Sequence, residues 1–162
     1  MYKKIKGILR KFDYYIYIDY SETFIGYIII HEEEIKEILP KISKLHHYKQ
    51  IKHKKQYITS VKRLIESNNI KSFLLKYKIR PMKDNTIVFT DVLEFVMKHD
   101  NCIILLSIDN NQYNVFIKLF NIIPHKEHVF VIKESDLRKD SVEYKLSLII
   151  DNLLNVERIK SK

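Results

Sequence analysis

The sequence is poor in the residues that mark several common classes of protein. It contains one cysteine, two glycines and three prolines, and it has neither tryptophan nor alanine. Because Cys102 is alone, a disulfide within the chain and a CxxC zinc site are both excluded, and we expect Cys102 to be a small buried apolar residue. No glycine-rich phosphate loop is present, which argues against a nucleotide-dependent kinase or ATPase.

Long apolar runs are missing as well. Segments 14–18, 24–30 and 102–106 are apolar, but each is far shorter than the roughly 20 residues that a membrane-spanning helix needs. The residues after Met1 include no apolar signal-peptide region. We therefore expect a cytoplasmic protein without a membrane partner.

The composition is that of a globular protein. Hydrophobic residues make up 46% of the 162 residues and charged residues 30%, which does not fit a disordered or collagen-like chain. A chain of this length buries roughly two-thirds of its unfolded surface around one core. No repeat or linker divides it, so a single domain is predicted over residues 1–162.

The charge is unevenly distributed. Lys and Arg number 29 against 20 Asp and Glu, a net charge of +9, although the excess of Lys, Ile, Asn and Tyr is also typical of AT-rich genomes. Between Glu37 and Glu66 there is no acidic residue, whereas many basic ones occur. Two interpretations stay open for this stretch, a solvated helix face or a surface that contacts the phosphates of a nucleic acid.

The apolar periodicity predicts an α/β fold. Alternating residues predict a β-hairpin from 13–19 and 24–30. Further strands are predicted at 70–79, 102–108 and 128–133, and helices at 32–45, 48–67, 86–99, 111–120 and 142–154. In the helix 86–99, Ile87 is placed on the inward face with Val88, Val92, Leu93 and Val96. Together these elements predict a mixed sheet of about five strands with helices on both faces.

Two aspartates follow predicted strands and a third lies on the last helix. Asp19 ends the first strand and Asp109 follows strand 102–108, so parallel neighbours would place both carboxylates at one edge, where ligands bind in open α/β sheets. Asp151 lies within the apolar pattern of helix 142–154. Oxygen ligands of this kind suit Mg²⁺ or Mn²⁺. The alternative is that Asp19 and Asp109 cap turns or helices and that Asp151 pairs with Lys145 or Arg158.

Short motifs resemble one known family. Asp19-Tyr-Ser-Glu followed by Phe24-Ile-Gly-Tyr is similar to the D-E-S-G start of the domain of unknown function 3800 family, and segment 140–151 is similar to its closing D-S…L-Q-x-x-D segment. Ser107-Ile-Asp109 resembles the central aspartate motif of that family. The resemblance implies a ribonuclease H-like fold and a metal site formed by the three aspartates. Gln50-Ile-Lys52 occupies the position of the family's E-x-K motif.

Three positions depart from the family pattern. Gln50 replaces a glutamate, Ser147 replaces a glutamine, and Tyr20 replaces the acid after Asp19. A neutral amide at Gln50 offsets no cation charge and would weaken the binding of a second metal ion. Glu22 or Glu143 is a candidate for the missing acid.

The leading hypothesis from the sequence is a nuclease or nuclease-like protein that uses Mg²⁺ or Mn²⁺ to act on nucleic-acid phosphodiesters. Asp19, Asp109 and Asp151 are its predicted catalytic and metal-binding residues. The residues predicted to contact nucleic acid are Gln50, Lys52, Lys54 and Lys55. The alternative is a catalytically inactive nucleic-acid-binding or protein-interaction module on the same fold, such as a component of a mobile element. The choice between DNA and RNA and the oligomeric state are left open.

Overall fold

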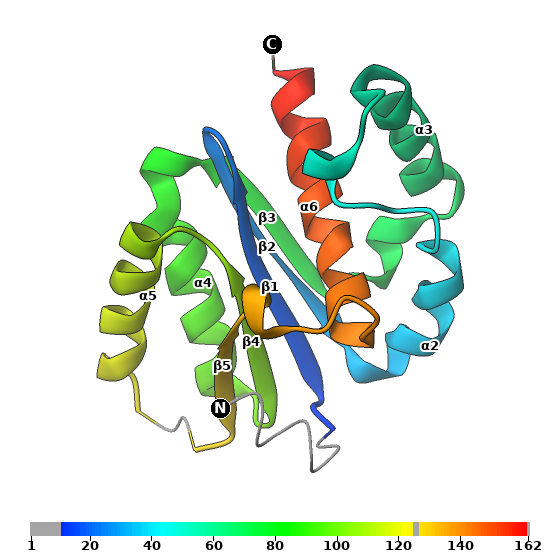
Figure 1. Cartoon of the computed structure of the whole chain (residues 1–162). Helices are drawn as coiled ribbons and strands as arrows, with labels where there is room; N and C mark the ends of the chain where they lie inside the picture. Colours follow the sequence, from blue (N-terminus) through cyan, green and yellow to red (C-terminus); the bar gives the residue numbers. More distant parts are fainter. Residues whose placement is uncertain (1–10, 125–126, 162) are drawn as a thin grey trace.

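A mixed β-sheet forms the centre of the molecule (Figure 1). The computed structural model describes residues 11–124 and 127–161. The strands are β1 (Tyr14–Ser21), β2 (Phe24–His31), β3 (Lys76–Pro81), β4 (Cys102–Ser107) and β5 (Val129–Lys133). They lie in the order β3-β2-β1-β4-β5. The pairs β1/β2 and β2/β3 are antiparallel, whereas β1/β4 and β4/β5 are parallel.

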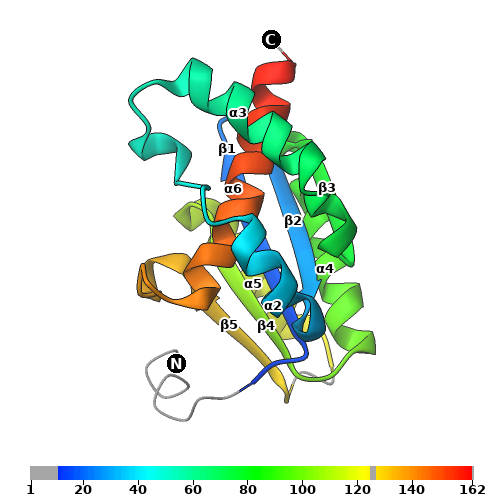
Figure 2. The ribbon, with the colours of Figure 1, turned by 90° about the vertical axis from the view of Figure 1, so that its right-hand side faces the viewer.

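Each parallel connection contains a helix, and helices cover both faces of the sheet (Figures 1 and 2). The helices are α2 (Glu32–Lys41), α3 (Lys54–Ser67), α4 (Asn85–Lys98), α5 (Asn110–Ile122) and α6 (Val142–Lys160). Three antiparallel strands, with α2 and α3 inserted between β2 and β3, are followed by two parallel strands, and this order is that of a ribonuclease H-like sheet. The predicted fold class is therefore confirmed.

The two faces of the sheet bury different sets of side chains. Tyr17 and Leu105 belong to the core under α2, α3 and α6, whereas Ile18 and Leu106 belong to the core under α4 and α5. Successive residues of a strand point to opposite faces, so odd-numbered positions of β1 and β4 face α6. Cys102 is buried in β4, where burial raises the pKa of its thiol to about 12, as expected of a core residue.

Two predicted elements are wrong in part. The helix predicted over 48–67 begins only at Lys54, because 48–50 form a short 3-10 turn, η1 (Tyr48–Gln50), followed by three residues outside any helix. The strand predicted over 70–79 begins at Lys76. Asn69 adopts a left-handed conformation with φ 52°, and the chain then forms the 3-10 helix η2 (Ile70–Phe73).

Smaller differences concern helix ends and one side chain. α2 ends at Lys41, one residue after Pro40, whereas α6 continues six residues beyond its predicted end. Ile87, predicted to face inward, is 44% exposed because it lies on the outward side of α4 with Thr90 and Glu94, whereas the buried side begins at Val88. None of the described helices combines the length and the apolar character needed to cross a membrane.

Candidate functional site

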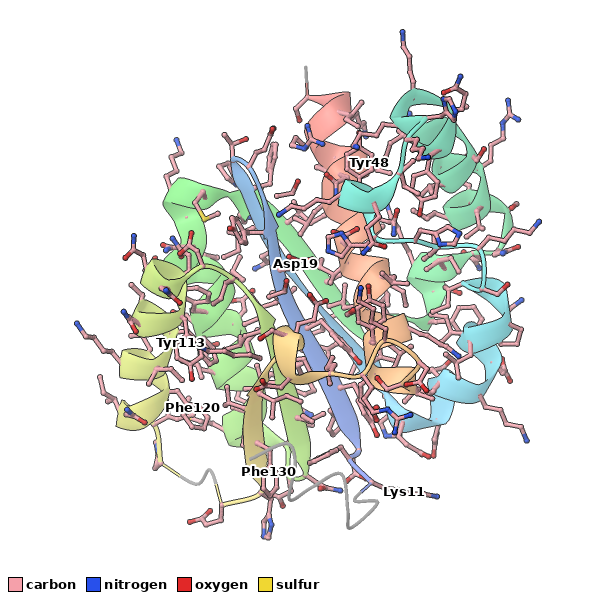
Figure 3. All side chains as sticks on the ribbon, viewed as in Figure 1. Lys11, Asp19, Tyr48, Tyr113, Phe120 and Phe130 are labelled. Carbon is pink, nitrogen blue, oxygen red and sulfur yellow. The ribbon has the colours of Figure 1, made fainter. Side chains whose placement is uncertain are left out.

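Three neighbouring strands each bring one polar side chain to the face that α6 covers. Asp19 on β1 is paired in register with Ser107 on β4, and both continue the odd-numbered face of their strands. On β5, Ile132 faces the same core, so Glu134, two residues further on, lies on that side as well. Figure 3 shows Asp19 beside α6 in the middle of the molecule.

Helix α6 supplies the fourth polar residue of this site. All residues from Leu146 to Asn155 are buried, because the sheet lies on one side of the helix and η1 and α3 pack against it from outside the sheet. Ser147, Asp151 and Asn155 are spaced by four residues and therefore share one side of the helix. Asp151 is thus held in the interior rather than at the surface.

The carboxylate of Asp19 lies in an environment that disfavours its charge. Burial is the main cause that raises its pKa well above the ordinary value, and the nearby carboxylates of Asp151 and Glu134 raise it further. The backbone N–H of Tyr20, 2.7 Å from Oδ1, and the hydroxyl of Ser107 act in the opposite direction. The net shift is upward because two hydrogen bonds do not replace the lost hydration.

Asp151 shows the same balance with different partners. Burial raises its pKa and Glu134 adds to this, whereas the N–H of Tyr48 and the nearby His47 and Lys49 lower it. The N–H of Tyr48 donates to Oδ2 at 2.9 Å, and Nε2 of His47 lies 3.8 Å from Oδ1. Nδ1 of His47 accepts from the N–H of Lys49 at 3.4 Å, which leaves Nε2 as the ring nitrogen on the side of Asp151.

Glu134 is the member of the cluster that the sequence reasoning missed. It follows β5 directly, in the 3-10 turn η4 (Glu134–Asp136), and its Oε2 accepts from Ser107 Oγ at 3.0 Å. The Ser107 hydroxyl also lowers the pKa of Asp19, so it lies near both carboxylates. The position of Glu134 directly after a strand was the signal that could have identified it, since the same reasoning selected Asp109 after β4.

Asp109 occupies a different position from Asp19 and Asp151. It is exposed, lies two residues beyond β4, and forms the N-cap of α5, where Oδ1 accepts from the N–H of Gln112 at 2.9 Å. The structure thus bears out the capping alternative for this residue. It brings Asp19 and Asp151 together with Glu134, while the metal-binding role of Asp109 stays a prediction.

The residues predicted to contact nucleic acid lie on the η1 turn and the start of α3. Gln50, Lys52, Lys54 and Lys55 are all exposed. Lys54 Nζ donates to the carbonyl of Ile51 at 2.7 Å and lies 5.5 Å from the centre of the Tyr48 ring. Because Tyr48 also bonds Asp151, this basic segment lies next to the acidic cluster (Figure 3).

Arg158 is not the partner of Asp151, contrary to one alternative considered above. Its guanidinium donates to Ser21 Oγ at 3.2 Å, to Asn155 Oδ1 at 2.9 Å and to Glu22 Oε2 at 3.2 Å. Glu22 adopts φ 52° in the turn between β1 and β2. These contacts fix the tip of the hairpin to α6, so Glu22 is engaged as the partner of Arg158.

The donor set of the cluster suits a hard divalent cation. Asp19, Asp151 and Glu134 offer carboxylate oxygens, the ligands that Mg²⁺ and Mn²⁺ prefer, and a cation would offset the repulsion that raises the two aspartate pKa values. In residues 11–124 and 127–161, no three His, Cys, Asp or Glu side chains are arranged as a group that could hold a metal ion. The residue types of the cluster thus suit Mg²⁺ or Mn²⁺, but their side chains are not already arranged as a metal site.

The fold and this site together define an α/β protein with a ribonuclease H-like sheet and a buried cluster of carboxylates under its last helix. Comparison with models of known protein families gives no match for the chain. A search of curated proteins likewise gives no significant match.

Proposed function

We propose that the protein is a metal-dependent nuclease, or a nuclease-like protein, acting on nucleic-acid phosphodiesters. The observation that carries the proposal is the cluster of Asp19, Asp151 and Glu134, whose carboxylates lie close enough to raise the pKa of Asp19. Buried carboxylates that repel one another are costly, and perturbed acids of this kind gather at functional sites. The basic η1 segment beside them supplies the charge expected for a phosphate-bearing substrate.

Each residue has a role in this proposal. Asp19, Asp151 and Glu134 would hold Mg²⁺ or Mn²⁺, and Asp109 stays a predicted further ligand at the same edge of the sheet. When bound, such a cation activates a water molecule and stabilises the charge that develops during phosphodiester hydrolysis. Ser107 orients the carboxylate of Glu134 through its hydrogen bond and lowers the pKa of the nearby Asp19.

The resemblance to the domain of unknown function 3800 family supports the same proposal. Its motifs place aspartates at 19, 109 and 151 of this chain. Two of these, Asp19 and Asp151, are the residues that the fold brings together under α6. Membership of that family is part of the proposal and is supported only by these motifs and by the fold.

A cleavage assay tests the proposed activity. We expect single- or double-stranded nucleic acid to be cleaved in Mg²⁺ or Mn²⁺ but not in EDTA, and Asp19→Asn to abolish cleavage. Asp136→Asn is the matched control, because Asp136 is exposed in the same turn as Glu134. Full activity of the Asp19→Asn protein would refute the proposal.

A second candidate, a catalytically inactive nucleic-acid-binding module, is favoured by one observation. Gln50 is exposed beside the acidic cluster at the position where the resemblance calls for a glutamate. In this case we expect salt-dependent binding that EDTA leaves unchanged. Replacing Lys52, Lys54 and Lys55 by Gln should weaken binding, and no cleavage should occur in either metal.

A further inference from the structure

A basic groove runs between α3 and α6 and reaches the edge strand β3. It consists of two adjoining pockets of about 840 and 460 Å³, which share Lys62, Val156 and Lys160 as lining residues. Helix α3 lies against the C-terminal half of α6, and β3 closes the far end (Figure 2). We call this surface the α3–α6 groove. Its lining residues do not include Asp19, Asp151 or Glu134, the acidic cluster that lies under the middle of α6.

The groove is strongly cationic. The smaller pocket is lined by Lys54, Lys55, Lys62 and Lys160, without any carboxylate. The larger pocket adds Lys71, Lys78 and Arg80 against Glu66 and Glu157. Lys78 forms an ion pair with Asp91 of α4, but the other cations of the groove still outnumber its two carboxylates. Lys62, Lys71 and Lys160 are exposed, so their ammonium groups are accessible to an anionic ligand.

The groove also contains an exposed aromatic ring. Tyr77 lines the larger pocket from the edge strand β3 and is 41% exposed. Lys71 Nζ lies 5.4 Å from the centre of this ring. An aromatic face next to a row of cations is the combination by which proteins bind single strands, since the ring stacks on a base while the cations contact the backbone phosphates.

The other end of the groove meets the acidic cluster. Tyr48 lines the smaller pocket, and its backbone N–H donates to Oδ2 of Asp151. Lys54 and Arg158 both lie over the Tyr48 ring, at 5.5 and 5.6 Å from its centre. A strand lying along the groove would therefore run from Tyr77 past Lys62 and Lys160 toward the carboxylates.

We propose that the α3–α6 groove binds a single-stranded nucleic acid, with phosphates at Lys62 and Lys160 and a base stacked on Tyr77. A duplex keeps its bases paired and stacked inside, so it cannot place one on Tyr77 without being opened. The inference rests on the proposed function in taking nucleic acid as the ligand. It goes further by naming the form of that ligand and the path that leads it to the carboxylates.

Binding in EDTA tests the groove separately from any cleavage. The probe is a fluorescein-labelled single strand of about 16 nucleotides, oligo(dT) or oligo(U), compared with a duplex of equal length by fluorescence anisotropy. We expect the double variant Lys62→Glu, Lys160→Glu to bind the single strand at least about tenfold more weakly. Its slope of log affinity against log salt should be smaller by about 1.4, the loss of two phosphate contacts.

The matched control reverses two charges elsewhere. Lys98→Glu with Lys118→Glu makes the same change in net charge on exposed residues of α4 and α5, on the other face of the sheet. We expect this control to bind within about twofold of the wild type. Equal losses in the two double variants would overturn the proposal, because binding would then depend on net charge alone.

The aromatic contact has its own test. Tyr77→Ala should weaken single-strand binding about tenfold while leaving the salt slope unchanged, whereas Tyr77→Phe, which keeps a ring, should bind as the wild type does. Duplex binding as tight as single-strand binding, or no effect of Tyr77→Ala, would overturn the proposal. So would binding of an acidic peptide in preference to either oligonucleotide. Single-strand binding without cleavage in Mg²⁺ or Mn²⁺ would refute the proposed nuclease activity yet support the groove.

Discussion

Asp151, in the middle of α6, raises the pKa of Asp19 on β1, although most of the chain separates the two residues. Both carboxylates are buried, and Glu134 adds a third negative charge to the same site. Burial and mutual repulsion both make the charged state costly. Burying these carboxylates together lowers the free energy of unfolding of the metal-free protein, and this decrease can be measured.

Asp19→Asn should stabilise the metal-free protein at neutral pH. The folded state raises the pKa of Asp19 above its ordinary value of 3.8. Between these two pKa values, the folded protein keeps a proton on the Asp19 carboxyl group that the unfolded chain releases. Wild-type stability therefore falls as the pH rises from about that ordinary value toward the raised pKa of the folded state. The asparagine carries no charge and still accepts from Tyr20 through its amide oxygen.

Thermal unfolding in EDTA at several pH values measures this effect. We expect a higher melting temperature for Asp19→Asn at pH 7 and a difference that shrinks as the pH approaches 3.8. Asp136→Asn, at an exposed position, should follow the wild type at each pH. A wild type that is as stable as Asp19→Asn at pH 7 and shows the same pH dependence would contradict the argument.

Mn²⁺ should raise the melting temperature of the wild type by binding the folded state alone. Glu134→Gln should reduce this increase, because the substitution keeps a hydrogen-bond acceptor for Ser107 while it removes one carboxylate from the cluster. Asp19→Asn should remove most of the increase. Differential scanning fluorimetry over a range of Mn²⁺ concentrations gives the apparent affinities. An unchanged affinity in the Glu134→Gln protein would exclude that residue from the cation site.

Asp109 calls for two substitutions, because it has both an observed role and a predicted one. Asp109→Ala removes the N-cap of α5 and should cost about 0.5–2 kcal/mol in the free energy of unfolding. Asparagine caps a helix about as well as aspartate, so Asp109→Asn should leave the stability nearly unchanged. The metal-ligand hypothesis predicts that Asp109→Asn still loses cleavage. If the Asp109→Asn protein cleaved at the wild-type rate, the role of Asp109 would be limited to capping α5.

Much of the fold could be predicted from alternation and helical periodicity. The apolar run 102–108 indicated a strand covered on both faces, and β4 is buried in that way between two parallel neighbours. Asp19 could be selected as the acid that ends the predicted strand 13–19, although β1 continues to Ser21. These signals are local, because each depends on residues that are close in the sequence.

The parts that could not be predicted depend on contacts between distant residues. The predicted helix 48–67 includes Tyr48, but the N–H of Tyr48 bonds Asp151 of α6, and this residue lies in η1, before α3 begins at Lys54. Glu134 gains its importance only when β5 is placed beside β4 and Ser107 reaches it. The position of Glu134 after a strand was a local signal, but no short pattern encodes its contact with Ser107 or the contact of Tyr48 with Asp151.

Gly26→Ala should destabilise the sheet and loosen the acidic site. A Cβ at this position would lie 2.8 Å from the backbone carbonyl oxygen of Lys78, 3.0 Å from Ile79 Cγ1 and 3.4 Å from Ile150 Cδ1. The carbonyl belongs to the paired strand β3 and cannot rotate away, so β2 and β3 must separate locally. We expect a loss of about 1–3 kcal/mol in the free energy of unfolding, measured by urea denaturation.

The same substitution should reach the carboxylates through α6. Gly26 is paired with Asp19 across β1 and β2, and Ile150 directly precedes Asp151, so the added methyl group pushes on both sides of the site. We therefore expect Gly26→Ala to weaken the Mn²⁺-dependent stabilisation as well as the fold. Ser43→Ala, at an exposed position after α2, provides a control that should change neither quantity. A Gly26→Ala protein with the urea midpoint of the wild type would show that the strands adjust without cost and would refute the steric argument.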